Sequence, residues 1–225
     1  MRVFVAGATG AVGRPLVAQL VEAGHEVVGT TRRKERADDL RTRWVEPVVV
    51  DALDADALAA TVRRARPDAV VQQLTALPKA GGAAAGEREH AATSNLRVEG
   101  TRALLRGAPD ARMVAQSVAF LTRPDGRPVH DEDAELFVDG PGSVGVNARA
   151  VRDMEEDVRK AGGSLCATGS CMAPAPGTTA TGPRPRRSPR AARRSSGTEG
   201  ACGPGCTWTT RRRPPWPRSS AGRGR

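Results

Sequence analysis

Three glycines near the start of the chain constrain its fold more than any other feature. A short apolar segment, residues 1–6, leads into Gly7-Ala-Thr-Gly10-Ala-Val-Gly13, and apolar residues then recur at helical spacing up to Ala23. This order is typical of a buried parallel strand, a tight turn and a helix. Gly7 would allow the sharp turn, Gly10 would let a pyrophosphate approach the backbone, and Gly13 would let the helix pack on the sheet. The free N–H groups of the helix would bind phosphates, so the loop predicts a dinucleotide site; a glycine-rich turn without a ligand is the alternative.

Strand and helix signals alternate over residues 1–165, which predicts an α/β fold with a parallel sheet and crossover helices. Apolar runs indicate the strands, and helical spacing, with Asp54 as an N-cap, indicates the helices. The predicted strands are 1–6, 26–30, 47–51, 69–74 and 112–117, and the predicted helices are 14–23, 36–44, 54–65, 91–105 and 147–160. Leu58, Ala59 and Val62 are expected to face the core.

The net charge of +10 is unevenly distributed. Residues 166–225 contain 12 Arg, no Lys and one acidic residue, Glu199, for a net charge of +11; residues 1–165 hold 23 basic and 24 acidic residues, for a net charge of −1. Nucleic-acid binding through this tail is a distant alternative function, because Trp208 and Trp216 are its only aromatic residues and no recognition fold is evident.

The cysteines and the apolar segments bear on metal binding and location. All four cysteines follow residue 165, with four residues between Cys166 and Cys171 and three between Cys202 and Cys206. These spacings and the lack of a later His disfavour a zinc site, so we expect no metal. No signal peptide or membrane-spanning run is evident, so we expect a cytoplasmic protein without disulfides and without a membrane partner.

Residues 1–165 resemble the NAD-dependent epimerase/dehydratase family, which comprises extended and atypical short-chain dehydrogenase/reductases. The resemblance lies in the Gly-x-x-Gly-x-x-Gly loop, Asp51-Ala-Leu-Asp54, Leu74-Thr-Ala76, Asn95 and Ser117. It implies a doubly wound, Rossmann-like sheet in which Asp51 meets the adenine amino group, Leu74-Thr-Ala76 lies against the cofactor, Asn95 is structural and Ser117 is catalytic. It also implies that two copies pair through a helix bundle. The predicted cofactor-binding residues are Gly7, Thr9, Gly10, Ala11, Val12, Gly13, Arg32, Arg33, Asp51, Ala52, Leu74, Thr75, Ala76 and Asn95.

The charges after the second predicted strand favour NADP over NAD. An NAD enzyme usually carries Asp or Glu here to hold the ribose 2′-hydroxyl group. This chain has Gly29-Thr-Thr-Arg-Arg-Lys34, with no carboxylate, and Arg32 or Arg33 could pair with a 2′-phosphate. The alternative is that the two arginines belong to a solvated turn.

The catalytic pair of the family, a Tyr and a Lys four residues later, is absent. The chain contains no Tyr, and the corresponding helix reads Asn147-Ala-Arg-Ala-Val151. Standard hydride transfer through a phenolate is therefore not supported. We expect an NAD(P)-binding protein of oxidoreductase or isomerase ancestry whose activity is impaired and whose small-molecule substrate is unidentified. A non-catalytic NADP-binding or sensor protein is the alternative. His130 could be proposed as a base, although a loop His among carboxylates is more often solvated.

After Leu165 the sequence resembles an out-of-frame translation. Hydrophobic periodicity ends, and nine of the 17 prolines follow. Reading back one base from Cys166 permits Leu-Arg-Tyr-Gly-Phe-Leu-Tyr-Gly-Pro-Gly-Thr-Trp-Tyr-Asp, which resembles the family's sixth strand and following loop. The segment from Ala201 likewise permits Val-His-Val-Asp-Asp. We therefore expect a frameshift near codons 163–166, a domain over residues 1–165 that lacks its sixth strand and most of its substrate pocket, and a disordered tail over 166–225.

Overall fold

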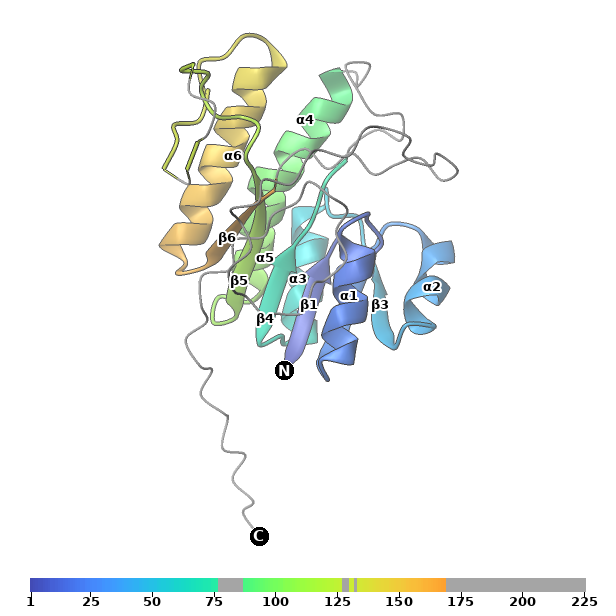
Figure 1. Cartoon of the computed structure of the whole chain (residues 1–225). Helices are drawn as coiled ribbons and strands as arrows, with labels where there is room; N and C mark the ends of the chain where they lie inside the picture. Colours follow the sequence, from blue (N-terminus) through green and yellow to red (C-terminus); the bar gives the residue numbers. More distant parts are fainter. Residues whose placement is uncertain (77–86, 127–129, 132, 169–225) are drawn as a thin grey trace, which may run out of the picture. The chain divides into compact units, whose positions relative to one another are not determined.

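The computed structural model describes residues 1–76, 87–126, 130–131 and 133–168. Within these residues, a parallel six-stranded sheet has the order β3-β2-β1-β4-β5-β6 (Figure 1). Its strands are β1 (Arg2–Ala6), β2 (Glu26–Thr31), β3 (Val45–Val49), β4 (Ala69–Gln72), β5 (Arg112–Val118) and β6 (Ser164–Thr168). This order is that of a doubly wound, Rossmann-like sheet, so the predicted fold class is confirmed.

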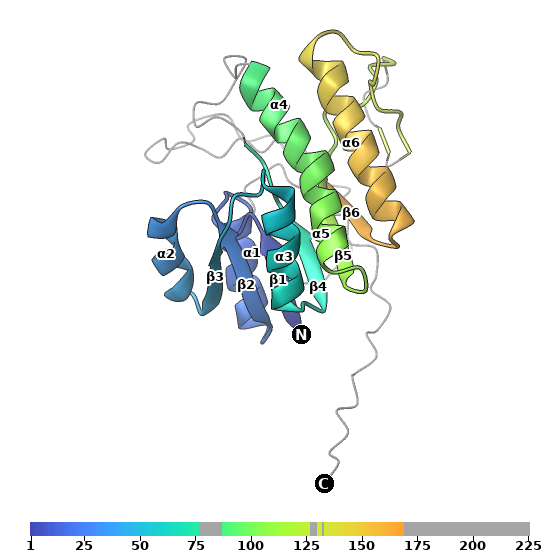
Figure 2. The same ribbon diagram turned by 180° about the vertical axis from the view of Figure 1, so that it is seen from behind.

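Helices cover both faces of the sheet (Figures 1 and 2). Helix α1 lies on one face, and α3, α5 and α6 lie on the other. The helical elements are α1 (Gly13–Glu22), the 3₁₀ turn η1 (Lys34–Arg36), α2 (Ala37–Arg41), α3 (Ala55–Ala65), α4 (Glu87–Asn95), the π-helical turn η2 (Leu96–Gly100), α5 (Thr101–Gly107) and α6 (Ser143–Lys160).

The alternation of side chains along the strands builds a core on each face. Val3 and Val5 of β1 belong to the same buried cluster as Val17 of α1 and Leu40 of α2. Phe4, between them, points the other way, into a larger cluster that includes Leu58, Val62, Leu104 and Met154. The predicted inward face of α3 is confirmed, because Leu58, Ala59 and Val62 are all buried.

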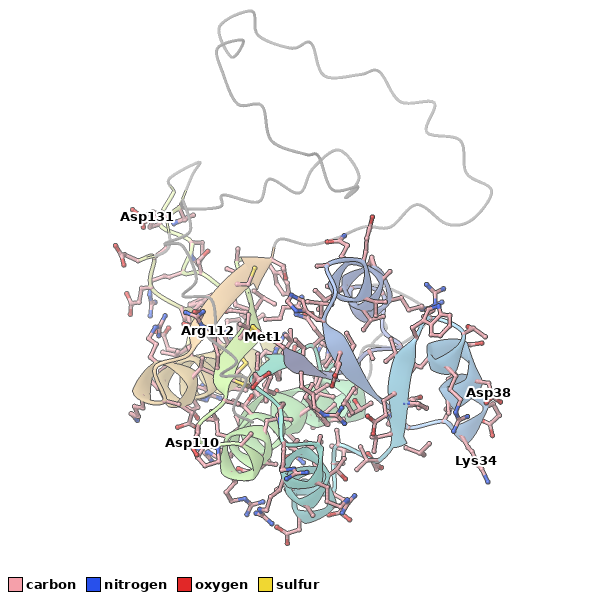
Figure 3. The ribbon with its side chains drawn as sticks, turned by 90° about the horizontal axis from the view of Figure 1, so that it is seen from below. Met1, Lys34, Asp38, Asp110, Arg112 and Asp131 are labelled. Atoms are coloured by element: carbon pink, nitrogen blue, oxygen red, sulfur yellow. The ribbon has the colours of Figure 1, made fainter. Side chains whose placement is uncertain are left out.

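The carboxyl ends of the parallel strands indicate where a ligand can bind. Figure 3 views the amino edge, where Met1 precedes β1 and Arg112 begins β5. In open parallel sheets, ligands bind at the opposite edge, beyond the carboxyl ends of the strands. The glycine loop follows β1 at that edge, and so do the segments after β3, β4 and β5.

One of two predicted helices keeps its predicted start, and the other is interrupted. Asp54 caps α3 as predicted, with its Oδ1 accepting a hydrogen bond from the Ala57 N–H at 2.9 Å. The predicted helix over 91–105 is instead divided into α4, η2 and α5, because a π-helical turn interrupts it. The spacing of apolar residues does not reveal a single π turn, because such a turn inserts only one extra residue into the helix.

The expectation that the domain lacks its sixth strand is wrong. Strand β6 pairs in parallel with β5, with Ser164 opposite Val114 and Thr168 opposite Val118. Leu165 packs against the larger core cluster. An edge strand needs mainly backbone hydrogen bonds and an apolar residue on its covered face, and Ser-Leu-Cys-Ala-Thr meets both needs without Gly or Pro.

The remainder of the predicted tail, 169–225, lies outside the described residues. No helix among the residues that the structure describes is long and apolar enough to cross a membrane.

Candidate dinucleotide site

The glycine loop turns sharply at the end of β1. Gly7 has a φ of +93°, a conformation that favours glycine. Its N–H donates to Thr30 Oγ1 of β2 at 2.9 Å, and the Gly10 N–H donates to the Gly7 carbonyl oxygen at 3.0 Å. The loop is therefore held by the neighbouring strand and by its own backbone, without a ligand.

The three glycines differ in how much space a Cβ atom would find at each position. A Cβ atom at Gly7 would lie 2.5 Å from the Gln73 carbonyl oxygen, and one at Gly13 would overlap the Gly7 carbonyl oxygen. Gly10 is less crowded, with the Gly7 carbonyl oxygen 3.2 Å away, and both Gly10 and Ala11 are exposed. Packing therefore requires Gly7 and Gly13, whereas Gly10 presents open backbone to solvent.

The start of α1 is suited to an anion. Its N-cap is Val12, which makes no side-chain capping bond, and its first turn contains no acidic residue. The first N–H groups of a helix lack partners within the helix and carry partial positive charge. Together with Thr9, Gly10 and Ala11, this helix end offers donors to a pyrophosphate.

Two arginines that sequence reasoning did not select flank this loop. Arg14 Nε donates to the Thr9 carbonyl oxygen at 3.2 Å, and Arg36 Nη1 donates to the same oxygen at 3.4 Å. With Arg43 and one acidic residue, Asp39, they line a small depression beside the loop. Arg36 lies in η1, soon after β2, and this position could have identified it as a second candidate for a 2′-phosphate.

The predicted pair Arg32 and Arg33 follows β2 directly. Both are exposed, and within the described part of the chain neither side chain makes a hydrogen bond. The Arg33 N–H donates to Thr31 Oγ1 at 3.2 Å, which holds the backbone at the start of the turn. Among the described residues, the two guanidinium groups thus have no hydrogen-bond partner, and they belong to the first turn after β2.

Asp51 and Ala52 lie beyond the carboxyl end of β3. Asp51 is exposed, and its Oδ1 accepts a hydrogen bond from the Leu53 N–H at 3.1 Å. Ala52 is buried in the core cluster that β1 shares. The backbone turn after β3 is therefore fixed, and the carboxylate stays at the surface.

The segment after β4 is anchored to α4. Leu74 is buried, Thr75 is exposed, and the Ala76 N–H donates to Thr93 Oγ1 at 3.2 Å. Asn95, the last residue of α4, is exposed, and its side chain makes no hydrogen bond among the described residues. A structural role for Asn95 stays a prediction, and the buried polar residue two positions later is Arg97.

A buried polar cluster joins α4 and η2 to α6, and sequence reasoning did not find it. Asn147 Oδ1 accepts from Ser94 Oγ at 3.2 Å and from Arg97 Nη1 at 3.5 Å. Asn147 Nδ2 lies 3.3 Å from His90 Nδ1 and donates to the Ser143 carbonyl oxygen at 2.8 Å. Burial lowers the pKa of Arg97. Only the helix pairing brings these residues together.

Ser117, the predicted catalytic residue, is buried in β5. Its hydroxyl donates to Glu155 Oε1 of α6, and Glu155 Oε2 forms an ion pair with Arg159 at 2.8 Å. β4 separates β5 from β1 in the sheet, so Ser117 lies two strands from the glycine loop. His130 Nε2 faces Asp125 Oδ1 at 3.6 Å in the loop after β5.

The sequence was compared with known families. The sequence model of the NAD dependent epimerase/dehydratase family matches residues 3–136. The chain belongs to this family. The match includes the glycine loop and the strands β1 to β5, so it covers the predicted dinucleotide site. Binding of an NAD(P) dinucleotide is the shared property of the family.

Relatives and solved structures agree with this assignment. A 3-diazoavenalumate denitrifying reductase of a Streptomyces species is 44% identical over 166 residues, which cover 69% of this chain and 50% of that protein. The chain thus spans about half the length of this reductase. The UDP-Glc/GlcNAc 4-epimerase of Campylobacter jejuni shares the fold, with a TM-score of 0.60 at 18% identity over 75% of this chain and 52% of that one. The enzyme WbmH of Bordetella bronchiseptica, solved with NAD+, has a TM-score of 0.58 at 19% identity over 75% and 55%.

Proposed function

We propose that this protein is an NADP(H)-dependent reductase that binds its coenzyme at the Gly7–Gly13 loop. The observation that carries the proposal is the open backbone at Gly10 and Ala11, directly before a helix whose first turn holds no acidic residue. This arrangement supports a pyrophosphate position. Asp51 would then lie at the adenine end, and the segment Leu74 to Ala76 would border the nicotinamide half.

The basic residues around the loop support NADP(H) over NAD(H). β2 ends at Thr31 and is followed by Arg32 and Arg33, where an NAD enzyme would place a carboxylate. Arg36 and Arg14, which both donate to the Thr9 carbonyl oxygen, add positive charge beside the loop. A guanidinium fork binds a phosphate with two parallel hydrogen bonds, so these groups suit a 2′-phosphate.

The reaction has to proceed without a tyrosine. Reduction of a carbonyl group needs both a hydride and a proton, and this chain holds no Tyr to supply the proton. An aryl diazonium acceptor needs the hydride alone. Held at the Gly7–Gly13 loop, the reduced coenzyme would supply the hydride pair for the new C–H bond and become oxidised, and the C–N pair would leave with N₂. The name of the Streptomyces relative, a denitrifying reductase of a diazo acid, points to the same class of acceptor.

Non-catalytic coenzyme binding is the second candidate function. The observation that favours it is the hydrogen bond that directs the Ser117 hydroxyl to Glu155, toward α6. In this case the protein would bind NADP(H) as a sensor and reduce no acceptor. Turnover separates the two candidates, whereas coenzyme binding does not.

Coenzyme titration tests the binding half of the proposal. We expect the full chain to bind NADPH at least about tenfold more tightly than NADH in isothermal titration, a difference of about 1.4 kcal/mol. The double variant Arg32→Ala/Arg33→Ala should lose most of this preference, because the two guanidinium groups that directly follow β2 and would pair with a 2′-phosphate are removed. Arg63→Ala, which removes an exposed arginine of α3, is the matched control and should keep it. Equal affinity for the two coenzymes in the unaltered protein contradicts NADP(H) selectivity.

Turnover tests the catalytic half. With 4-carboxybenzenediazonium and NADPH, we expect the absorbance of NADPH to fall and benzoate to form in equal amounts, faster than without protein. A panel of carbonyl compounds should give no turnover. If NADPH binds but neither the diazonium salt nor any carbonyl compound is reduced, the non-catalytic function replaces the reductase.

A further inference from the structure

Arg97 is a buried cation without an acidic partner among the described residues. Arg97 is only 7% exposed, and its one side-chain hydrogen bond to a described residue is the 3.5 Å contact with the neutral Asn147. Other arginines of the same helical run differ: Arg102, five residues later, pairs with both Glu99 and Asp157. A buried charge without a counter-ion costs free energy, so an anion that reached Arg97 would offset this cost.

The unused donors of Arg97 are not sealed inside the protein. A guanidinium carries five N–H donors, and the single contact with Asn147 uses one of them. Among the described residues, some side-chain atoms are fully buried and have no hydrogen-bond partner. They belong to Gln72, Gln73, Thr101 and His130, and no nitrogen of Arg97 is one of them. The remaining donors therefore reach accessible space.

The surroundings of Arg97 are polar but neutral. Ser94 and Asn147 are bonded to each other, and His90 lies against Asn147. No second Lys or Arg is hydrogen-bonded to this cluster in the part of the chain that the structure describes. One guanidinium fork with neutral neighbours matches a monoanionic carboxylate better than a phosphate dianion.

The cluster adjoins the coenzyme site through the backbone. Thr93, the residue before Ser94, accepts the Ala76 N–H, and Ala76 ends the segment that we place beside the nicotinamide half. Arg97 itself lies in the π-helical turn η2, and single π turns occur mostly at functional sites. The helices α4 and α6 stand side by side in both ribbon views.

We propose that Arg97, between α4–η2 and α6, binds the carboxylate of an aryl acid substrate. The inference rests on the proposed reductase function, because it supplies the recognition of an acidic acceptor beside the coenzyme. Arg97 would accept the carboxylate in a two-point contact, and Ser94 and His90 would line the mouth of the site. The aryl ring would then extend from the helix seam toward the segment after β4.

The test measures binding of an unreactive carboxylate. Benzoate and benzamide are titrated into the full chain that is saturated with NADPH, and then into the chain alone. We expect benzoate to bind and benzamide, which has the same shape but no charge, to bind at least about tenfold more weakly. Arg97→Met should weaken benzoate binding by about tenfold to a hundredfold, whereas Arg102→Met, the exposed control on α5, should leave it unchanged.

Thermal unfolding separates this role from a structural one. Because Arg97 has no acidic partner in the part of the chain that the structure describes, Arg97→Met should keep or raise the melting temperature of the free protein while losing the rise that benzoate causes. NADPH affinity should be the same in Arg97→Met and the unaltered protein. Unchanged benzoate affinity in Arg97→Met, no benzoate binding in the unaltered chain, or tighter Arg97-dependent binding of inorganic phosphate would each overturn the carboxylate site. Loss of NADPH binding with benzoate binding intact would instead overturn the proposed function alone.

Discussion

Gly10 and Gly13 lie three residues apart in one loop, yet an added methyl group would act on them for different reasons. At Gly13 the methyl group would overlap the Gly7 carbonyl oxygen and the backbone of Ala8. At Gly10 the nearest atom is 3.2 Å away, so the backbone needs to give by only a few tenths of an ångström. The sequence identifies both glycines as part of one motif, but only the packed structure separates Gly13, which packing requires, from Gly10, which is exposed.

Alanine substitutions test this division of roles. Gly13→Ala should lower the free energy of unfolding by roughly 1–3 kcal/mol, because the helix has to move away from the loop. Gly10→Ala should change stability little and weaken NADPH binding by about tenfold or more, because the methyl group occupies the place of a phosphate oxygen. Urea unfolding and coenzyme titration on both variants give the comparison. Full NADPH affinity in Gly10→Ala would place the pyrophosphate elsewhere.

Strand β6 is the element for which sequence reasoning and structure differ most. The residues after Gly163 lack the family pattern, yet Ser164–Thr168 completes the sheet beside β5. Backbone pairing is largely independent of side chains, and Leu165 supplies the apolar contact. For the helices, too, the sequence predicts only part of the structure. The spacing of apolar residues predicts that the helices exist, whereas η2 and the contact between Arg97 and Asn147 depend on how α4 packs on α6.

The reactivity of Cys166 tests whether β6 is formed. Cys166 lies in β6, and burial raises the pKa of its thiol. A raised pKa means less thiolate at pH 8, so iodoacetamide should label Cys166 more slowly in the folded protein than in urea. The folded-state rate should continue to rise at pH values above the ordinary thiol pKa. Peptide mass spectrometry measures the labelling at this one residue.

A matched pair of variants sharpens this experiment. At Gly163 a Cβ atom would lie 2.8 Å from Val158 Cγ1 and 2.9 Å from the Met113 carbonyl oxygen. Gly163→Ala should therefore loosen β6 and speed the labelling of Cys166, whereas Ala161→Ser, at an exposed position two residues earlier, should not. Equal labelling rates in the folded and unfolded protein would show that β6 is not stably paired.

At the scale of the whole molecule, the chain combines a family domain with a basic segment of different composition. The family match covers residues 3–136, and the described sheet ends at Thr168. The composition of 166–225, with 12 Arg and one acidic residue, does not continue the family pattern. We propose that a shift of reading frame near codons 163–166 separates the two parts.

The DNA sequence across codons 155–225 tests this proposal. We expect a single-base insertion or deletion near codons 163–166, after which the corrected frame encodes Leu-Arg-Tyr-Gly-Phe and, later, Val-His-Val-Asp-Asp. The intact mass of the protein purified from its source should match the corrected frame. One uninterrupted frame in the DNA, together with a mass that matches the present sequence, would refute the frameshift.

The sequence by itself determined the class of fold, the glycine loop, the cap of α3 and the absence of a tyrosine, because each is a property of local spacing or composition. The tertiary structure decided which glycine is open, which arginines surround Thr9, and that Arg97, Ser94 and Asn147 meet across two helices. It also decided that β6 forms. These features depend on contacts between residues up to some fifty positions apart, such as Arg97 and Asn147, and no local pattern in the sequence encodes such contacts.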